Sequence, residues 1–160
     1  MAPDKGNKQP LHDGACPISD YLDNIIDSSF DSIVVGDMSG RITRVNAAFD
    51  RLLGYSRQEI LGSTPSVFSV LEKGVYETAS GEQVHIDDQY MTKAAGIIDS
   101  LFEKGHIKNW AIYVLRKDGR VVPVELNITF MHDKSGERIG SVAIIRDITE
   151  RKQAERKYNR

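Results

Sequence analysis

Apolar residues near the start of the chain recur at the spacing of a helix that has one apolar side. The chain enters this segment through Pro17, which suits the first position of a helix, and the positions between the apolar residues carry aspartate and asparagine. The pattern predicts an amphipathic helix over residues 17–30, with a stripe that needs a partner surface. The stripe consists of Ile18, Tyr21, Leu22, Ile25, Ile26 and Phe30.

Strand spacing replaces helical spacing in the next segment. Residues 32–36 form a β-branched run, residues 41–45 alternate between polar and apolar, and a turn of Asp, Met, Ser and Gly separates them. This arrangement predicts a β-hairpin. Directly afterwards, Asn46 predicts the N-cap of a short helix, and a capping-box pattern that begins at Ser56 predicts another.

The pattern in the middle of the chain is ambiguous. Residues 74–86 fit either a small hairpin that turns at Ser80 and Gly81 or a plain loop, and both interpretations stay open. A helix over residues 87–104 follows, with Asp87 or Asp88 at its start and a glycine just after its end.

Three strands over residues 108–116, 121–131 and 138–146 complete the predicted fold, and glycine-containing turns separate them. Two strands, several helices and three further strands favour an α+β fold with an antiparallel sheet. The strand over 108–116 is apolar on both of its faces. We therefore expect it to be covered on both sides, with the N-terminal helix as one cover.

The two ends of the chain have different patterns. Residues 1–16 are polar and show no periodicity, so they are predicted to be a disordered segment. Residues 149–160 are charged and predict a helix that has too few apolar residues to be stable alone. We interpret it as the start of a longer output or connector helix.

Composition and charge exclude several classes of function. The 160 residues, of which 40% are hydrophobic, fit one globular domain. The net charge of −2 provides no field that attracts nucleic acid, and no apolar run approaches the roughly 20 residues of a membrane span. We expect a cytoplasmic location, with no contact of this fragment with nucleic acid or membrane. Cys16 is the one cysteine, which rules out an internal disulfide.

No pattern typical of catalysis is present in the sequence. It has no glycine-rich phosphate loop and no nucleophile in a recognisable setting. The domain is therefore expected to be non-catalytic, although a parent protein can carry an enzymatic output domain. The string from His85 to Asp88 fits either metal ligation or helix capping. Capping is favoured because aspartates suit the positive end of a helix, so no metal site is predicted.

Three strings follow one another along the chain: "SIVVGDMSGRITRVNAAFDRLLGYSRQEILG", "HIDD" and "RKDGRVVPVELNITFMHDKSGERIGSVAIIRDITERKQAE". In this order they resemble the PAS family with its C-terminal PAC motif. The resemblance covers residues 22–156 and implies a PAS core over 31–148. It implies one five-stranded antiparallel sheet of order 2-1-5-4-3, with helices on one face that enclose a cavity. His85 comes later than the family pattern places it, which indicates an insertion near residues 67–83.

The resemblance also implies where ligands and partners bind. Ligand-cavity candidates on the strands and the long helix are Trp110, Ile112, Leu126, Ile128, Ser141, Ala143, Met91 and Ile98. The alternative is a filled hydrophobic core with no ligand. The other face of the sheet docks the N-terminal helix or a second subunit in many family members, and the dimer-interface candidates are Tyr21, Leu22, Ile25, Ile26 and Tyr113.

The sequence names no cofactor. A heme-binding PAS domain commonly uses a histidine on the long helix, and that helix has none, with His85 and His106 only flanking it. A flavin-adduct sensor needs a cysteine in the core, and Cys16 lies outside it. Heme and flavin are therefore disfavoured, the cofactor stays unknown, and a small organic ligand is the simplest expectation.

These expectations combine into a sensory or regulatory domain of a signal-transduction protein, such as a histidine kinase of a two-component system or a diguanylate cyclase. A bound ligand would change the sheet, and Arg146, Asp147, Ile148 and Thr149 would relay the change through the C-terminal helix. The output domain would lie in the same polypeptide, and the protein would form a homodimer. One alternative is a ligand-free PAS dimerisation module, and a second is a heme-based gas or redox sensor.

Overall fold

A five-stranded antiparallel sheet forms the centre of the computed structural model, which describes residues 17–159. The predicted disorder of residues 1–16 and the position of Cys16 lie outside the described residues. The strands run in the order β2-β1-β7-β6-β5. Numbered among themselves, these five strands have the expected order 2-1-5-4-3. Their bounds are β1 Ser32–Gly36, β2 Ile42–Val45, β5 His106–Leu115, β6 Val121–His132 and β7 Arg138–Asp147.

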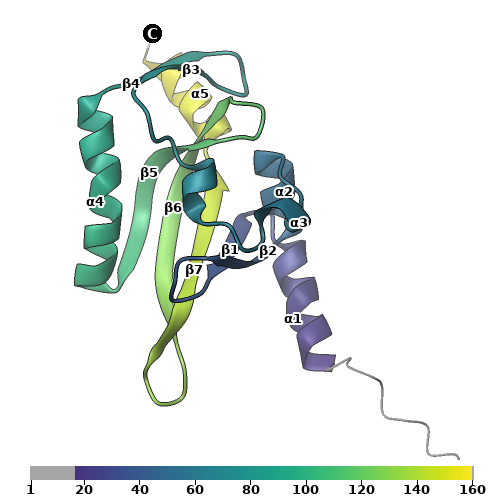
Figure 1. Ribbon diagram of the computed structural model, residues 1–160. Coiled ribbons are helices and arrows are strands. Elements are labelled where there is room, and N and C mark those ends of the chain that lie inside the picture. The colour runs from purple at the N-terminus through teal and green to yellow at the C-terminus, as the bar shows by residue number, and fades with distance from the viewer. Residues whose placement is uncertain (1–16, 160) are drawn as a thin grey trace, which may run out of the picture.

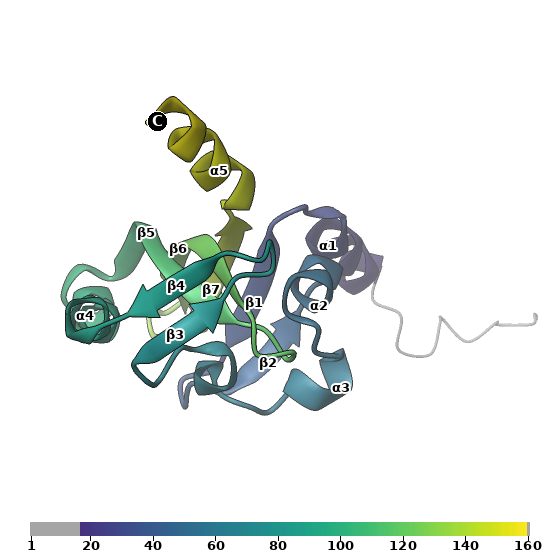
Figure 2. The same ribbon diagram turned by 90° about the horizontal axis from the view of Figure 1, so that it is seen from above.

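The helices lie around this sheet (Figure 1). Helix α4 runs along the edge strand β5, whereas α1, α2 and α3 lie at the opposite side, near β1 and β2. Viewed from above, α5 projects away from the sheet (Figure 2). The bounds are α1 Pro17–Ser28, α2 Ala47–Leu53, α3 Arg57–Ile60, the 3₁₀ helix η1 Pro65–Phe68, α4 Asp88–Lys104 and α5 Thr149–Tyr158.

The predicted helix caps are confirmed. Asn46 accepts a hydrogen bond from the backbone N–H of Phe49 at the start of α2, and Asp87 accepts one from Tyr90 at the start of α4. Ser56 and Glu59 form the reciprocal capping box of α3. Each cap satisfies N–H groups that the helix itself leaves without a partner.

The ambiguous segment forms a small separate hairpin. Strands β3 (Gly74–Glu77) and β4 (Gln83–Ile86) pair with each other and lie outside the main sheet. Gly81 adopts a left-handed φ of 89° in the turn between them, a conformation that glycine adopts without strain. Of the two open interpretations, the hairpin is the one observed.

Alternate residues of the edge strand β5 enter two different hydrophobic clusters. Ile112 and Val114 belong to the main core, which joins the sheet to α2, α3, η1 and α4. Tyr113 and Leu115 point the other way, as strand alternation requires. They pack in a second cluster, here called the hairpin cluster, whose members are Val70, Tyr76, Val84, Ile86, Tyr90, Met91, Tyr113, Leu115 and Val121.

The expectation that the N-terminal helix covers this strand is wrong. Helix α1 lies against α2, near the edge of the sheet opposite to β5 (Figure 1). The second cover of β5 is the β3–β4 hairpin together with the first turns of α4. The Tyr90 hydroxyl also accepts a hydrogen bond from the Tyr113 backbone N–H at 2.9 Å. It thereby satisfies an edge group that β6 does not reach.

Candidate functional site

Six of the predicted ligand-cavity residues gather on the helix-facing side of β5, β6 and β7. Trp110 pairs with Leu126 across β5 and β6, and Ile128 pairs with Ala143 across β6 and β7. Leu126 is buried, whereas the others are half-buried and pack at the margin of the main core or beside it. The Nε1 atom of Trp110 is buried and has no hydrogen-bond partner among the described residues. This surface is therefore apolar but carries one unsatisfied donor.

The two predicted cavity residues on α4 lie elsewhere. Met91 packs in the hairpin cluster, and Ile98 is 57% exposed. The α4 residues that enter the main core are Ile97 and Leu101. Their spacing of four residues is a helical signal that the sequence contains, but the neighbouring stripe through Ile98 is equally apolar, so periodicity did not separate them.

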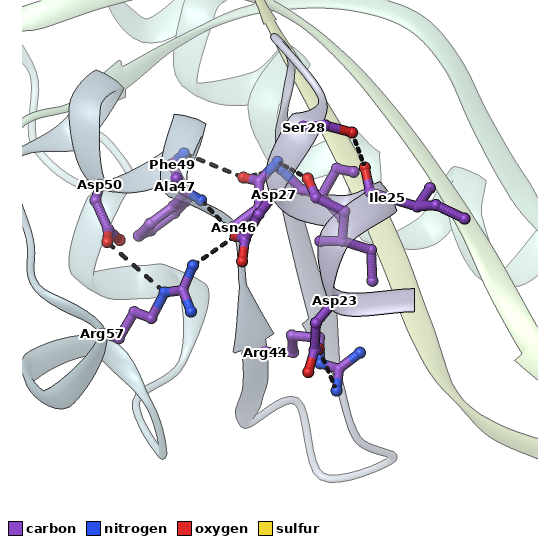
Figure 3. A network of polar contacts seen from close by, with 12 residues as sticks. Asp23, Ile25, Asp27, Ser28, Arg44, Asn46, Ala47, Phe49, Asp50 and Arg57 are labelled. Atoms are coloured by element: carbon purple, nitrogen blue, oxygen red, sulfur yellow. Dashed lines mark hydrogen bonds and ion pairs between the residues drawn. The ribbon is translucent and has the colours of Figure 1, made fainter. Parts of the chain in front are cut away.

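One buried amide ties the end of α1 to the sheet and to α2 (Figure 3). The Asn46 Oδ1 atom accepts hydrogen bonds from the backbone N–H groups of Ile33 and Phe49, at 2.9 and 3.1 Å. Its Nδ2 atom donates to the backbone oxygens of Ile26 and Asp31, both at 2.9 Å. Because Asn46 has an exposed fraction of 0%, all four bonds form away from water. The side chain thus fixes where α1 ends relative to the sheet.

Charged contacts surround this amide. Asp27 of α1 accepts hydrogen bonds from the Ala47 backbone N–H at 3.1 Å and from Arg57 at 2.5 Å (Figure 3). A second ion pair joins Asp23 of α1 to Arg44 of β2 at 2.9 Å. The pKa of Asp50, which also faces Arg57, is raised because burial disfavours its charged form. Polar contacts therefore connect α1 to β2, α2 and α3.

The predicted dimer-interface residues divide into two groups. Tyr21, Leu22 and Ile25 have exposed fractions of 67%, 47% and 50%, and Ile26 beside them is half-buried. Tyr113 lies far from them, with its ring centroid 6.0 Å from that of Tyr90 under the hairpin. The structure thus brings four of the five residues together on α1 and separates Tyr113 from them.

The sheet face that points away from the main core carries a shallow pocket of about 220 Å³. Val142 and Ile144 of β7 line it together with Asn127 and Thr129 of β6. Ile144 is 39% exposed, although its neighbour Ile145 is buried in the main core. The last strand is therefore apolar on both faces, and Ile144 on its outer face is exposed.

The junction between β7 and α5 contains the four predicted relay residues. Ile148 is 3% exposed, and its backbone N–H donates to the Pro123 oxygen of β6 at 3.0 Å. The Asp147 Oδ1 atom accepts hydrogen bonds from the backbone N–H and the hydroxyl of Thr149, at 2.9 and 2.5 Å. A buried side chain and a local polar turn together set the direction in which α5 leaves the sheet.

Within residues 17–159, the arginines of this junction, Arg146 and Arg151, pair with carboxylates other than Asp147. Arg146 instead pairs with Asp31 at 3.2 Å, and the hydrogen bond to Asp31 raises the pKa of Arg146. Arg151 donates two hydrogen bonds to Glu125 of β6, at 3.1 and 3.0 Å. The two arginines thus reach carboxylates outside the junction, Asp31 just before β1 and Glu125 on β6.

The structure bears on the metal and membrane expectations only within residues 17–159. Asp87 caps α4, and the neighbouring His85 is exposed. The described residues contain no group of three or more histidine, cysteine, aspartate or glutamate side chains placed to hold a metal ion. Among the described helices, none is long and apolar enough to cross a membrane.

A family model described as "PAS domain" matches residues 31–150. The matched range begins just before β1 and ends in the first turn of α5. It therefore contains the whole sheet, the hairpin and the junction.

Curated relatives are much longer than this chain. It is 25% identical over 138 residues to sporulation kinase C of Bacillus subtilis, a match that covers 86% of this chain and 28% of that protein. It is 26% identical over 137 residues to the signal transduction histidine-protein kinase AtoS of Escherichia coli, covering 84% of this chain and 19% of that one. The chain thus spans less than a third of either relative.

Solved structures with the same architecture include a PAS domain of a protein from Colwellia psychrerythraea. It is 25% identical, with a TM-score of 0.61, and the match covers 83% of this chain and 98% of that one. An RNA-binding light-oxygen-voltage receptor has a TM-score of 0.63 at 21% identity, over 89% of this chain and 37% of that one. At this identity the second likeness concerns the fold alone.

Proposed function

The chain belongs to the PAS domain family, and we propose that it is the sensory or regulatory input domain of a signal-transduction protein. In this proposal α5 relays a change in the sheet to an output domain further along the same polypeptide. The similarity to segments of two longer kinases supports this role, because each of those proteins contains much more chain than the matched segment.

The observation that carries the proposal is the buried start of the output helix. Ile148 is held in the fold by its own burial and by the hydrogen bond to Pro123. A shift of β7 against β6 would therefore move the first turn of α5 with it. Packed elements of this kind switch between discrete arrangements because dense cores deform little.

The ligand that we propose is a small organic molecule that binds against the helix-facing side of β5, β6 and β7. The half-buried apolar side chains there would contact its apolar part, and a hydrogen-bond acceptor on it would satisfy the Nε1–H group of Trp110. A buried donor without a partner costs free energy, so a ligand that supplies the acceptor gains affinity. Such a ligand changes output only if it binds two conformations of the domain with different affinity.

A second candidate function is dimerisation without a ligand. The exposed apolar side chains of α1 and the shallow apolar pocket on the outer sheet face favour it. Contact between these surfaces on two copies would bury both.

Native mass spectrometry and an absorption spectrum of the purified protein distinguish the two candidates. The sensory proposal predicts a bound small-molecule mass or an absorption band, whereas the second candidate predicts a dimer with no added mass. The relay is tested by Asp147→Ala in the longer protein that contains this domain, with Asp99→Ala on the exposed surface of α4 as control. The first variant should uncouple signal from output and the control should not. Unchanged regulation in both variants would contradict the relay.

A further inference from the structure

The β3–β4 hairpin contacts both α4 and the output helix. Val84 and Ile86 of β4 pack in the hairpin cluster against Tyr90 and Met91 of α4. At the other end of the hairpin, the Glu82 carboxylate forms an ion pair with Arg156 of α5. In Figure 1 the hairpin accordingly lies beside α5 at the end of the sheet.

The turn that presents Glu82 is itself firmly held. The Thr78 side chain is 4% exposed, and its hydroxyl accepts a hydrogen bond from the Glu82 backbone N–H at 3.0 Å. The Thr78 backbone N–H donates to the Glu82 oxygen at 2.7 Å, and that of Ala79 donates to Val121 of β6 at 3.0 Å. Because Val121 is fully buried, the turn is anchored to a buried position at the start of β6. The Glu82 carboxylate is thus placed by a rigid support.

The position of helix α5 depends on side-chain ion pairs to the rest of the domain. No residue of Thr149–Tyr158 is buried, and a helix of ten residues is marginal without support. Arg151 holds it to Glu125 of β6, and Arg156 holds it to the hairpin. Five residues correspond to about 140° around a helix, so the two arginines restrain α5 from different sides.

We propose that the β3–β4 hairpin is a clasp that fixes the direction of α5 and connects it directly to α4. This route runs from Tyr90 and Met91 through the hairpin to Glu82 and Arg156, alongside the route through β7 and Ile148. A movement of the first turns of α4 would shift the hairpin and hence the second restraint on α5. The clasp itself does not depend on the proposed function, but its regulatory meaning rests on α5 being the output helix.

Hydrogen exchange of α5 amides in residues 1–160 tests the clasp. Glu82→Gln and Arg156→Gln should each raise exchange in α5 by about two- to five-fold, the range expected for loss of an exposed ion pair. The double variant Glu82→Arg with Arg156→Glu should restore the slower exchange. The matched controls are Glu77→Gln in the hairpin and Lys157→Gln in the helix, neither of which forms an ion pair within residues 17–159. The controls should leave α5 exchange unchanged.

Two results would overturn the clasp: unchanged α5 exchange in both single variants, or a double variant that exchanges as fast as they do. The thermal midpoint should stay constant in every variant, which separates a local restraint from general destabilisation. Output measurements on the longer protein then separate this inference from the proposed function. Faster α5 exchange with unaltered output regulation would support the clasp and contradict the role of α5 as the output helix.

Discussion

At the scale of single residues, Asn46 shows how much one buried polar side chain organises. Its role as the N-cap of α2 follows from the sequence and is confirmed. Its bonds to Ile26, Asp31 and Ile33 were not predicted, because local patterns describe contacts within a few residues and these partners lie 13 to 20 positions away. Only the folded chain brings those backbone groups to the amide.

We expect Asn46→Ala to lower the free energy of unfolding by about 3 kcal/mol, since it removes a helix cap and leaves several buried backbone groups without partners. Urea unfolding measures this loss. Asn24→Ala on the exposed surface of α1 is the control and should change the value by less than about 0.5 kcal/mol. Equal stability of both variants would mean that the amide contributes little.

Gly140 is a second residue whose role is visible only in the structure. A Cβ atom at this position would lie 2.2 Å from the backbone oxygen of Gly36 on the neighbouring strand. Gly140→Ala should therefore push β1 and β7 apart and cost more than about 2 kcal/mol. Gly96→Ala is the control, because its Cβ would meet no atom of residues 17–159 within 4 Å and alanine favours the helix by about 0.5–1 kcal/mol. Thermal unfolding should move the two midpoints in opposite directions.

At the scale of elements, two hairpin turns of the sheet are closed by the same arrangement of hydrogen bonds. Asp37 and Asp133 each begin a turn of Asp-x-Ser-Gly, and each Oδ1 atom accepts hydrogen bonds from the serine hydroxyl and from two backbone N–H groups. The sequence predicted both turns. The bonds to the serines lower the pKa of both aspartates because they favour the charged form.

These hydrogen bonds make the stability of the fold depend on pH in a defined direction. A carboxylate with a lowered pKa in the folded state stabilises the fold above its unfolded pKa, and the contribution is lost as the pH falls through the folded pKa. Asp133→Ala should therefore be less stable than the wild type at pH 7, and the difference should shrink steadily below about pH 4. Urea unfolding across this range measures it. The control Lys134→Ala should show a constant difference, and a constant difference for Asp133→Ala would contradict the mechanism.

Helix α1 was predicted over residues 17–30 and forms over Pro17–Ser28, so Phe30 of the predicted stripe lies beyond its end, and the predicted partner is wrong. The helix packs on α2 and leaves Leu22 and Ile25 about half exposed. If a second copy covers them, Leu22→Asp combined with Ile25→Asp should convert a dimer to a monomer, because charges at an apolar contact are costly. Light scattering after size exclusion measures the mass. Ile139→Asp, at an exposed position of β7, is the control and should stay dimeric.

At the scale of the whole molecule, the β3–β4 hairpin adds a second hydrophobic cluster to the domain. The main core and this hairpin cluster lie on opposite faces of β5. The main core joins the sheet to α2, α3, η1 and α4. The hairpin cluster was not predicted, because its residues come from β3, β4, α4, β5, β6 and the segment before β3, which only the folded chain brings together. Residues 67–83, where the sequence predicts an insertion, contain the end of η1 and much of the β3–β4 hairpin, and residues of this hairpin cover one face of β5.

If the hairpin cluster is part of the cooperative fold, Val84→Ala should lower the free energy of unfolding by about 2 kcal/mol, since Val84 is 9% exposed. The unfolding transition should remain single and concerted. Val75→Ala, 58% exposed on the paired strand, should have almost no effect. Two separate transitions in the wild type would show that the hairpin folds independently of the sheet.

Outside residues 74–86, the sequence by itself determined the elements, their caps and turns, and the order that resembles a PAS domain, because these depend on spacing and chemistry within a few residues. Tertiary structure alone decided which surfaces meet. It packed α1 against α2, and the hairpin against the face of β5 that carries Tyr113 and Leu115. It also paired Arg146 with Asp31, and Arg156 with Glu82. An apolar stripe indicates only that a surface needs to be buried. It does not indicate which partner buries it, because the hydrophobic effect is non-directional. Chain connectivity and packing in three dimensions therefore select each partner.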